Sequence, residues 1–125
     1  MSLVFVLALA VAPAPPPGPA MSGFLDAQQL RNLCLADQID PSTRRALCLG
    51  YIAGAVDQLL VRAASRPTTR REFCVPRGAT VEEVGTVILH RLSRPQDLTG
   101  ISAASAIRSA LHAEYPCPPS RFDRP

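Results

Sequence analysis

The sequence has no lysine, no tryptophan and few aromatic residues of any kind. All 13 of its basic side chains are arginine, and the aromatics are two tyrosines and four phenylalanines. The aromatics are scattered along the chain, so they do not form the stacking platform of a protein that binds single-stranded nucleic acid. The formal net charge of +3 is also too small to indicate binding to a phosphate backbone. We therefore expect no nucleic-acid partner.

The chain starts with an apolar run, Leu3 to Ala12, that is too short to span a bilayer as a helix. Its length is typical of the hydrophobic part of a secretory signal, and Gly18-Pro19-Ala20 offers small residues for cleavage. No basic residue precedes the run, so either translation starts further upstream or the run is only a hydrophobic tail. The expected organisation is a signal peptide and proline-rich leader over 1–20, a helical domain over 21–119 and a tail over 120–125.

Four cysteines are present, without the short C-x2-C spacing of a zinc site. They are Cys34, Cys48, Cys74 and Cys117. An even count behind a signal-like leader predicts two disulfides in an oxidising compartment. Sequence alone leaves three pairings open; we favour Cys34–Cys48, which would join two successive helices, and Cys74–Cys117, which would fasten a loop to the last helix. In the chain-entropy model these bonds contribute about 3 and about 4 kcal/mol respectively.

Helical periodicity predicts an all-α protein. Apolar residues recur at the three- and four-residue spacing of amphipathic helices in four segments. The expected helices span residues 23–35, 41–65, 81–92 and 100–114. The connection 66–79, which contains Pro76, is the one long loop, and residues 73–75 within it could pair briefly as a strand. We therefore expect a small four-helix, or at most five-helix, bundle that is stapled by disulfides.

Local signals mark the starts of these helices. Ser22 is the expected N-cap of the first helix, and Asp40 before Pro41 is a favourable start for the second. Thr80 and Glu83 match a capping box, in which each side chain accepts a hydrogen bond from the other residue's backbone N–H. Thr80 is therefore the expected N-cap of the third helix.

The second helix carries Gly50, Gly54 and Asp57 on one face, beside an apolar stripe that contains Tyr51. Each glycine inside a helix is about 1 kcal/mol less favourable than alanine, so the pair predicts a close approach by another backbone. A carboxylate on such a crowded face needs a partner. Since no second acid or base lies near Asp57 in the sequence, we interpret it as a structural acceptor that caps a neighbouring helix or loop.

Four arginines lie in or beside the long loop. They are Arg66, Arg70, Arg71 and Arg77. Because arginine is enriched at protein interfaces and binds carboxylates with two parallel hydrogen bonds, this cluster is the candidate surface for a protein partner with an acidic rim. The alternative is that these side chains are simply solvated on a surface loop.

No group of residues forms a recognisable catalytic site. The capping box and the helix dipole account for Glu82 and Glu83. Neither His90 nor His112 has an evident nucleophile or acid beside it in the sequence. We expect no enzymatic activity, no metal and no cofactor.

Several positions of the domain, taken as a set, resemble the Rap/Tai family, the small bacterial immunity proteins of type VI secretion. The resemblance covers Phe24 to Cys117. It is carried by Cys34, by Cys48-x-x-Tyr51-Ile52-x-Gly54-x-x-Asp57, by Phe73-Cys74-x-Pro76-x-Gly78-x-Thr80 and by Tyr115-Pro116-Cys117. It implies a helical, disulfide-bonded protein exported to the periplasm that binds and inhibits a peptidoglycan-cleaving amidase toxin, often as a homodimer.

An alternative is a periplasmic chaperone-like module, or another helical module that binds proteins or lipid. Such a module would need a continuous apolar groove or an apolar surface that becomes uncovered under stress. The expected helices have ordinary amphipathic stripes without a surplus apolar face, so we favour the immunity function. After removal of the leader we expect no stable membrane insertion.

Overall fold

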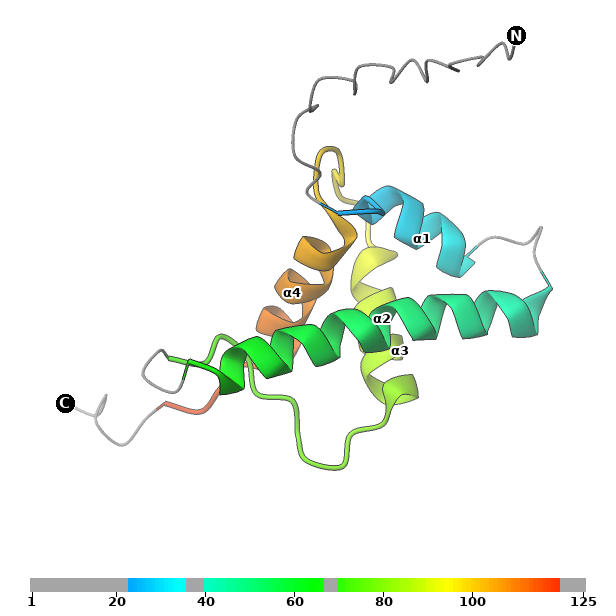
Figure 1. Ribbon diagram of the computed structural model, residues 1–125. Helices are drawn as coiled ribbons and strands as arrows, with labels where there is room; N and C mark the ends of the chain where they lie inside the picture. Colours follow the sequence, from blue (N-terminus) through cyan, green and yellow to red (C-terminus); the bar gives the residue numbers. More distant parts are fainter. Residues whose placement is uncertain (1–22, 36–39, 67–69, 120–125) are drawn as a thin grey trace, which may run out of the picture.

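Helices make up the regular structure of the described residues, 23–35, 40–66 and 70–119, in the computed structural model of this chain (Figure 1). They are α1 (Ala27–Leu35), α2 (Pro41–Ala64), α3 (Val81–Leu92) and α4 (Ala103–Glu114). The predicted all-α fold with four helices and one long loop is confirmed. The expected leader and tail lie outside the described residues, so this division of the chain stays a prediction.

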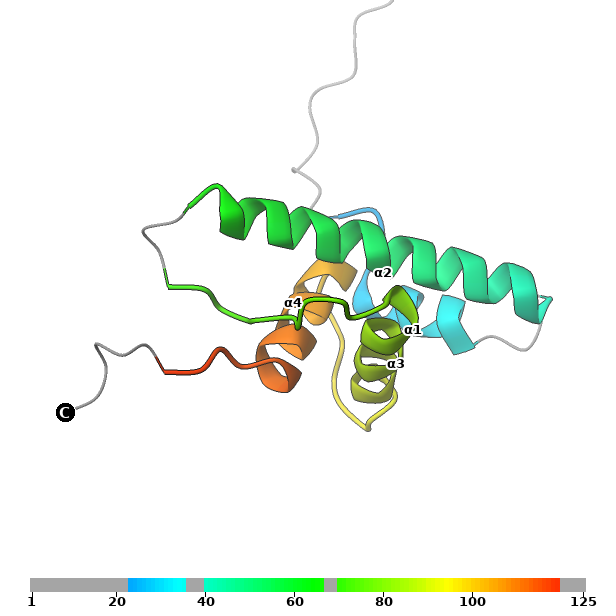
Figure 2. The same ribbon diagram turned by 90° about the horizontal axis from the view of Figure 1, so that it is seen from below.

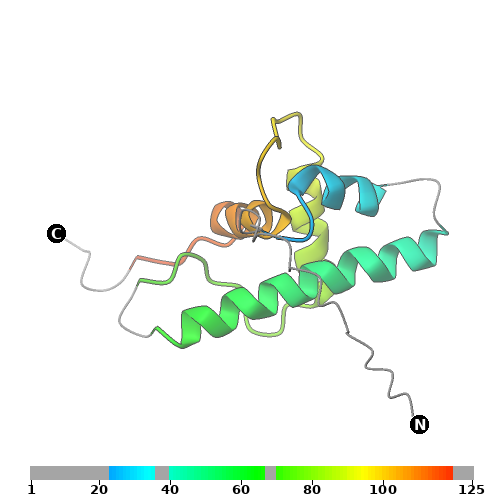
Figure 3. The same ribbon diagram turned by 45° about the horizontal axis from the view of Figure 1, so that its top comes forward.

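The longest helix, α2, forms one side of the molecule, and the other three helices pack against it (Figures 2 and 3). Only three of its 24 residues are buried, Cys48, Ile52 and Val56, each four residues after the last. This spacing places them on one stripe of the helix, which faces the core. The largest fully buried side chains of the core come from all four helices. They are Leu30, Ile52, Ile88, Leu92, Ile107 and Leu111.

The cysteines form the two favoured pairs, Cys34–Cys48 and Cys74–Cys117. Their Cα atoms are 5.1 and 4.9 Å apart, which is within the ordinary range for disulfides. The first bond joins the end of α1 to α2. The second joins the α2–α3 connection to the chain that follows α4. Each bond therefore fastens a segment that has few buried side chains of its own.

The starts of α2 and α3 are those predicted. The Asp40 carboxylate accepts a hydrogen bond from the Thr43 backbone N–H at 3.0 Å and a very short one from the Ser42 hydroxyl. The hydrogen bond from Ser42 is the main cause that lowers the pKa of Asp40. At α3 both halves of the capping box are present: Thr80 N–H donates to Glu83 at 2.8 Å and Glu83 N–H donates to Thr80 at 3.2 Å. Each cap supplies acceptors for N–H groups that have no partner inside the helix.

The first helix begins later than predicted, at Ala27 rather than near Gly23. Asp26 and Gln29 form a reciprocal pair in which Gln29 N–H donates to the Asp26 carboxylate at 2.7 Å and Asp26 N–H donates to the Gln29 amide oxygen at 2.9 Å. This arrangement is a capping box, and it fixes the start of the helix. The expected N-cap, Ser22, lies outside the described residues.

The fourth helix also begins later than predicted, at Ala103, because Ser102 is its N-cap and accepts a hydrogen bond from Ser105 N–H at 3.2 Å. The residues before it pair with those before α1. Ala27 N–H donates to the Ile101 carbonyl at 2.8 Å, and Ala103 N–H donates to the Leu25 carbonyl at 2.9 Å. This short antiparallel bridge holds the starts of α1 and α4 together.

The expected close approach at Gly50 and Gly54 is wrong for the described part of the chain. Both glycines are exposed, and a Cβ atom built on either would meet nothing within 4 Å. The close approach lies instead at Gly85 of α3, where a Cβ atom would be 2.5 Å from Leu49 Cδ2 of α2. Sequence spacing places Gly50 and Gly54 on one face but does not say whether another element covers that face.

Replacing Gly50 or Gly54 by alanine should therefore stabilise the protein. Each substitution removes a helix-interior glycine without creating a contact, so it should add about 1 kcal/mol and raise the midpoint of thermal unfolding by roughly 4–8 °C. Circular dichroism of the purified variants measures this midpoint. Gly78→Ala is the control and should lower it, since Gly78 has a φ of +86° that alanine adopts only with strain. A lower midpoint for the Gly50 or Gly54 variant would show that a neighbour packs there.

Asp57 does not make the capping bond that was expected. Its side chain is exposed, and among the described residues it accepts no hydrogen bond. It lines a cavity of about 110 Å³ together with Thr80 and Val81 at the start of α3. Tyr51, on the neighbouring apolar stripe of α2, is half-buried and packs against the core as expected.

By length and composition alone α2 could cross a membrane, with a mean hydropathy of 1.3 over 18 residues. The core helix of a soluble protein passes the same test. In this structure α2 contributes Cys48, Ile52 and Val56 to the core and is covalently joined to α1. Only 17% of this hydropathy window is buried, so the burial of α2 does not decide between the two, and the absence of membrane insertion stays a prediction.

Candidate functional site

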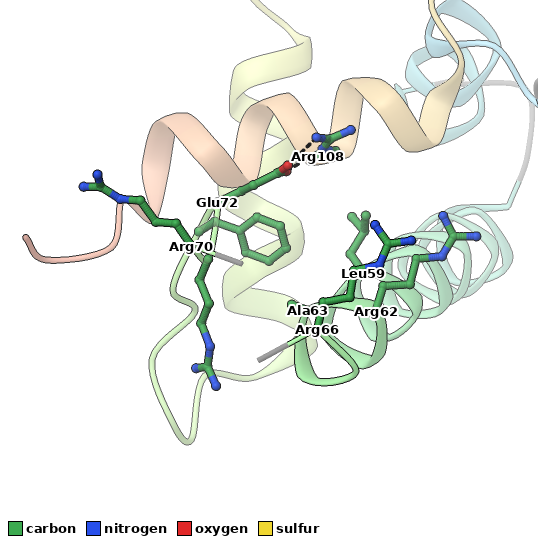
Figure 4. A pocket seen from close by; sticks show the side chains of 9 residues that line it. Leu59, Arg62, Ala63, Arg66, Arg70, Glu72 and Arg108 are labelled. Carbon is green, nitrogen blue, oxygen red and sulfur yellow. Dashed lines mark hydrogen bonds and ion pairs between the residues drawn. The ribbon is translucent and has the colours of Figure 1, made fainter. Parts of the chain in front are cut away.

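A strongly charged cleft of about 290 Å³ lies between the end of α2, residues 70–73 and α4 (Figure 4). We call it the arginine cleft. Its lining consists of Leu59, Arg62, Ala63, Arg66, Arg70, Arg71, Glu72, Phe73 and Arg108. Five arginines and one glutamate give this lining a formal charge of +4.

The α2 side of the cleft is set by helical spacing. Leu59, Arg62, Ala63 and Arg66 are three or four residues apart and share one face at the end of the helix (Figure 4). Leu59 and Ala63 are half-buried, and Phe73 across the cleft is only 6% exposed. The cleft therefore has an apolar floor and a cationic rim.

On the opposite side, Arg108 of α4 binds Glu72 with two hydrogen bonds (Figure 4). The Arg108 Nε donates to Glu72 Oε2 at 2.5 Å, and Nη2 makes an even shorter contact with Oε1. The guanidinium lowers the pKa of Glu72, and the carboxylate raises the pKa of Arg108. Because both side chains are about half exposed, this pair contributes little to stability. Its main effect is to fix the direction of the Arg108 side chain.

The backbone that carries Arg70 and Arg71 is held in place from its C-terminal side. Phe73 is buried in the core, Cys74 is bonded to Cys117, and Cys74 N–H donates to the Tyr115 carbonyl at 2.7 Å. This single hydrogen bond forms no β-bridge, so the brief strand pairing expected for residues 73–75 is not found among the described residues. The two arginines therefore extend from a stretch of chain that is anchored at Cys74.

A second cavity, of about 420 Å³, also borders residues 70–72. Its lining consists of Arg70, Arg71, Glu72, His112, Pro116 and Cys117. Because Arg70 and Arg71 line both cavities, the cationic surface continues from the arginine cleft toward the end of α4.

The structure brings together three of the four arginines that the sequence singled out. Arg66, Arg70 and Arg71 line the arginine cleft, whereas Arg77 lies in the exposed turn before α3 and does not. Sequence reasoning missed Arg62 and Arg108. Arg62 stands four residues before Arg66, so following the face of α2 to its end would have found it.

The described lining can bind anions but has little means of catalysis. Arginine stays protonated at physiological pH and donates hydrogen bonds without accepting them, so it is a poor acid or base and a good ligand for carboxylates. In the described part of the chain no group of three His, Cys, Asp or Glu side chains could hold a metal ion. The arginines of the lining can therefore bind carboxylates.

Residues 21–117 match the family model of the Rap1a immunity proteins. The matched segment includes all four cysteines and every residue of the arginine cleft. Comparisons with curated proteins and with solved structures give no match.

Proposed function

This chain belongs to the Rap1a immunity protein family, and from that premise we propose that it binds and inhibits a peptidoglycan-cleaving amidase toxin of type VI secretion in the periplasm. The observation that carries the proposal is the arginine cleft. An immunity protein acts by covering a toxin, and the cleft supplies a concave, charged surface for such a contact. The choice of an amidase as target comes from the resemblance to the Rap/Tai family.

The disulfides support a periplasmic location. All four cysteines of the chain are paired, and such bonds persist in oxidising compartments and are rare in the bacterial cytoplasm. The apolar run Leu3 to Ala12 has the length of a secretory signal, which supports export across the inner membrane.

The alternative of a chaperone-like or lipid-binding module has weaker support. Its support is that large apolar side chains are exposed, among them Phe24, Leu47 and Val61. The mainly apolar cavity between α2 and the start of α3 holds only about 110 Å³, whereas sites for small molecules usually hold roughly 300–1,000 Å³. A periplasmic pull-down separates the two functions, since an inhibitor retains one stoichiometric partner and a chaperone retains many weakly.

The proposal predicts protection of a cell against a periplasmic amidase. Type VI amidases, including any encoded beside this chain, are directed to the periplasm of a test strain, and lysis is followed by optical density. The full chain should prevent lysis by its cognate amidase, and the purified domain should abolish the cleavage of isolated peptidoglycan at a near-equimolar ratio. A variant without residues 1–20 is the control and should not protect the cells while still inhibiting the enzyme in solution. Failure to inhibit any amidase would overturn the proposal.

A further inference from the structure

Building on the proposed function, we propose that the arginine cleft receives an acidic segment of the toxin in which an apolar side chain is flanked by carboxylates. The apolar side chain lies on the floor of the cleft, and the carboxylates pair with the arginines of the rim. The proposal deepens the immunity function because it names the chemistry of the partner at one site.

Charge is the first argument for an acidic occupant. Glu72 is the single carboxylate among the lining residues, and it is bound by Arg108 through both of its oxygens. Arg62 and Arg71 bind no carboxylate among the described residues, so these two guanidinium groups keep their positive charge at the rim. A concave surface with one sign of charge concentrates the field and attracts ligands of the opposite sign.

The floor of the cleft is the second argument, because it selects against a compact anion. Leu59, Ala63 and the buried Phe73 provide apolar surface where a phosphate would require N–H donors. The cleft also adjoins the C-terminal end of α2, whose partial negative charge disfavours a small anion placed deep inside. An amphipathic protein segment satisfies both regions, since its apolar side chain covers the floor while its carboxylates stay at the rim.

Pre-organisation is the third argument. The rim arginines extend from three fixed supports: the end of α2, the segment anchored by the Cys74–Cys117 bond, and α4, where Glu72 orients Arg108. A binding surface whose backbone is already placed, and whose Arg108 side chain is held by Glu72, loses less conformational entropy on binding. Arginine also forms paired hydrogen bonds with carboxylates, which gives such a surface directional specificity.

The test compares two double charge reversals. Arg62→Glu with Arg71→Glu changes the cleft, and Arg77→Glu with Arg94→Glu changes two exposed arginines outside it. Each arginine-to-glutamate change removes two charges, so either pair shifts the formal net charge by −4, from +3 to −1. Any difference in binding between the two variants therefore comes from the position of the substitutions and not from the change in net charge. All four side chains are exposed, and circular dichroism checks that both variants fold.

The first probe is the peptide acetyl-Glu-Glu-Phe-Glu-Glu-amide, titrated into the labelled domain and followed by NMR. The amide signals of Arg71, Phe73 and Arg108 should shift, while that of Arg77 should not. A peptide with lysine in place of glutamate should shift none of them. The cleft reversal should abolish the shifts and the control reversal should keep them. Equal shifts with both peptides, or equal behaviour of both variants, would overturn the proposal.

The second probe is the cognate amidase, measured by calorimetry. The cleft reversal should weaken binding at least roughly 30-fold, as expected when a paired interface charge is lost, and the control reversal should weaken it less than about 3-fold. Amidase binding that the cleft reversal leaves unchanged would overturn the proposal for the cleft alone and leave the immunity function standing. If the wild-type domain binds no amidase, both proposals fail. Vesicles of anionic phospholipid test a membrane as the occupant. If the wild-type domain binds these vesicles, and the cleft reversal abolishes this binding but leaves amidase binding unchanged, the surface binds a membrane and the proposal is overturned.

Discussion

Replacing Cys74 and Cys117 by serine should reduce both the stability of the protein and its affinity for a partner, whereas the same change at Cys34 and Cys48 should reduce stability alone. The two bonds close loops of 43 and 14 residues. In the chain-entropy model their removal lowers the free energy of unfolding by about 4 and about 3 kcal/mol. On stability the two variants should therefore differ only slightly.

The affinity for the partner should distinguish the two disulfide variants because the two bonds hold different segments of the chain. The Cys74–Cys117 bond anchors the stretch of chain that presents Arg70 and Arg71 to the arginine cleft. Without it, both side chains have to be ordered when the partner binds, at about 0.5–1.5 kcal/mol each, so affinity should fall roughly 5- to 150-fold. The Cys34–Cys48 bond joins α1 to α2, and neither of its cysteines lines the cleft.

Denaturant unfolding and calorimetry with the cognate amidase measure the two effects. Both disulfide variants are also made with Gly50→Ala and Gly54→Ala, which should offset part of the lost stability and keep the domain folded during the binding assay. An equal loss of affinity in the two folded variants would show that the cleft does not depend on its nearby bond.

The parts of the fold that sequence predicted well are those fixed by nearby residues. Asp40 with Pro41, and Thr80 with Glu83, satisfy backbone groups within three or four positions, so their chemistry can be recognised without knowledge of the tertiary structure. The start of α1 was missed although Asp26 and Gln29 carry a similar local signal. In that case a second plausible N-cap upstream competed with the correct one.

The parts that sequence predicted poorly depend on how the helices pack. Arg108 meets Glu72 across 36 positions of the chain, and nothing local to either residue indicates the contact. Glycine spacing was misleading for the same reason: Gly50 and Gly54 face outward, while the contact with Leu49 falls at Gly85, a lone glycine in its helix. Helical periodicity says which residues share a face, and only the tertiary structure says what covers it.

The attachment of α1 depends on one large side chain, so Leu30→Ala should strongly destabilise the protein. The buried residues of this nine-residue helix are Ala27 and Leu30, both with no exposed surface. Truncating a fully buried leucine lowers the free energy of unfolding by about 2–5 kcal/mol, because apolar contacts are lost and a cavity remains. For a domain of this size the midpoint of thermal unfolding should fall by roughly 10–25 °C.

Leu47→Ala is the matched control, because it makes the same change within a helix at a residue that is 51% exposed. Leucine and alanine have similar helix propensities, so this variant should stay within about 0.5 kcal/mol of the wild type. The Cys34–Cys48 bond still tethers α1 in Leu30→Ala, so the loss measures packing and not the proximity of the two helices. Native-state hydrogen exchange should then show the α1 amides opening before those of α3 and α4. Equal effects of the two leucine variants would mean that α1 is held by its disulfide and its bridge to α4 alone, without a contribution from the core.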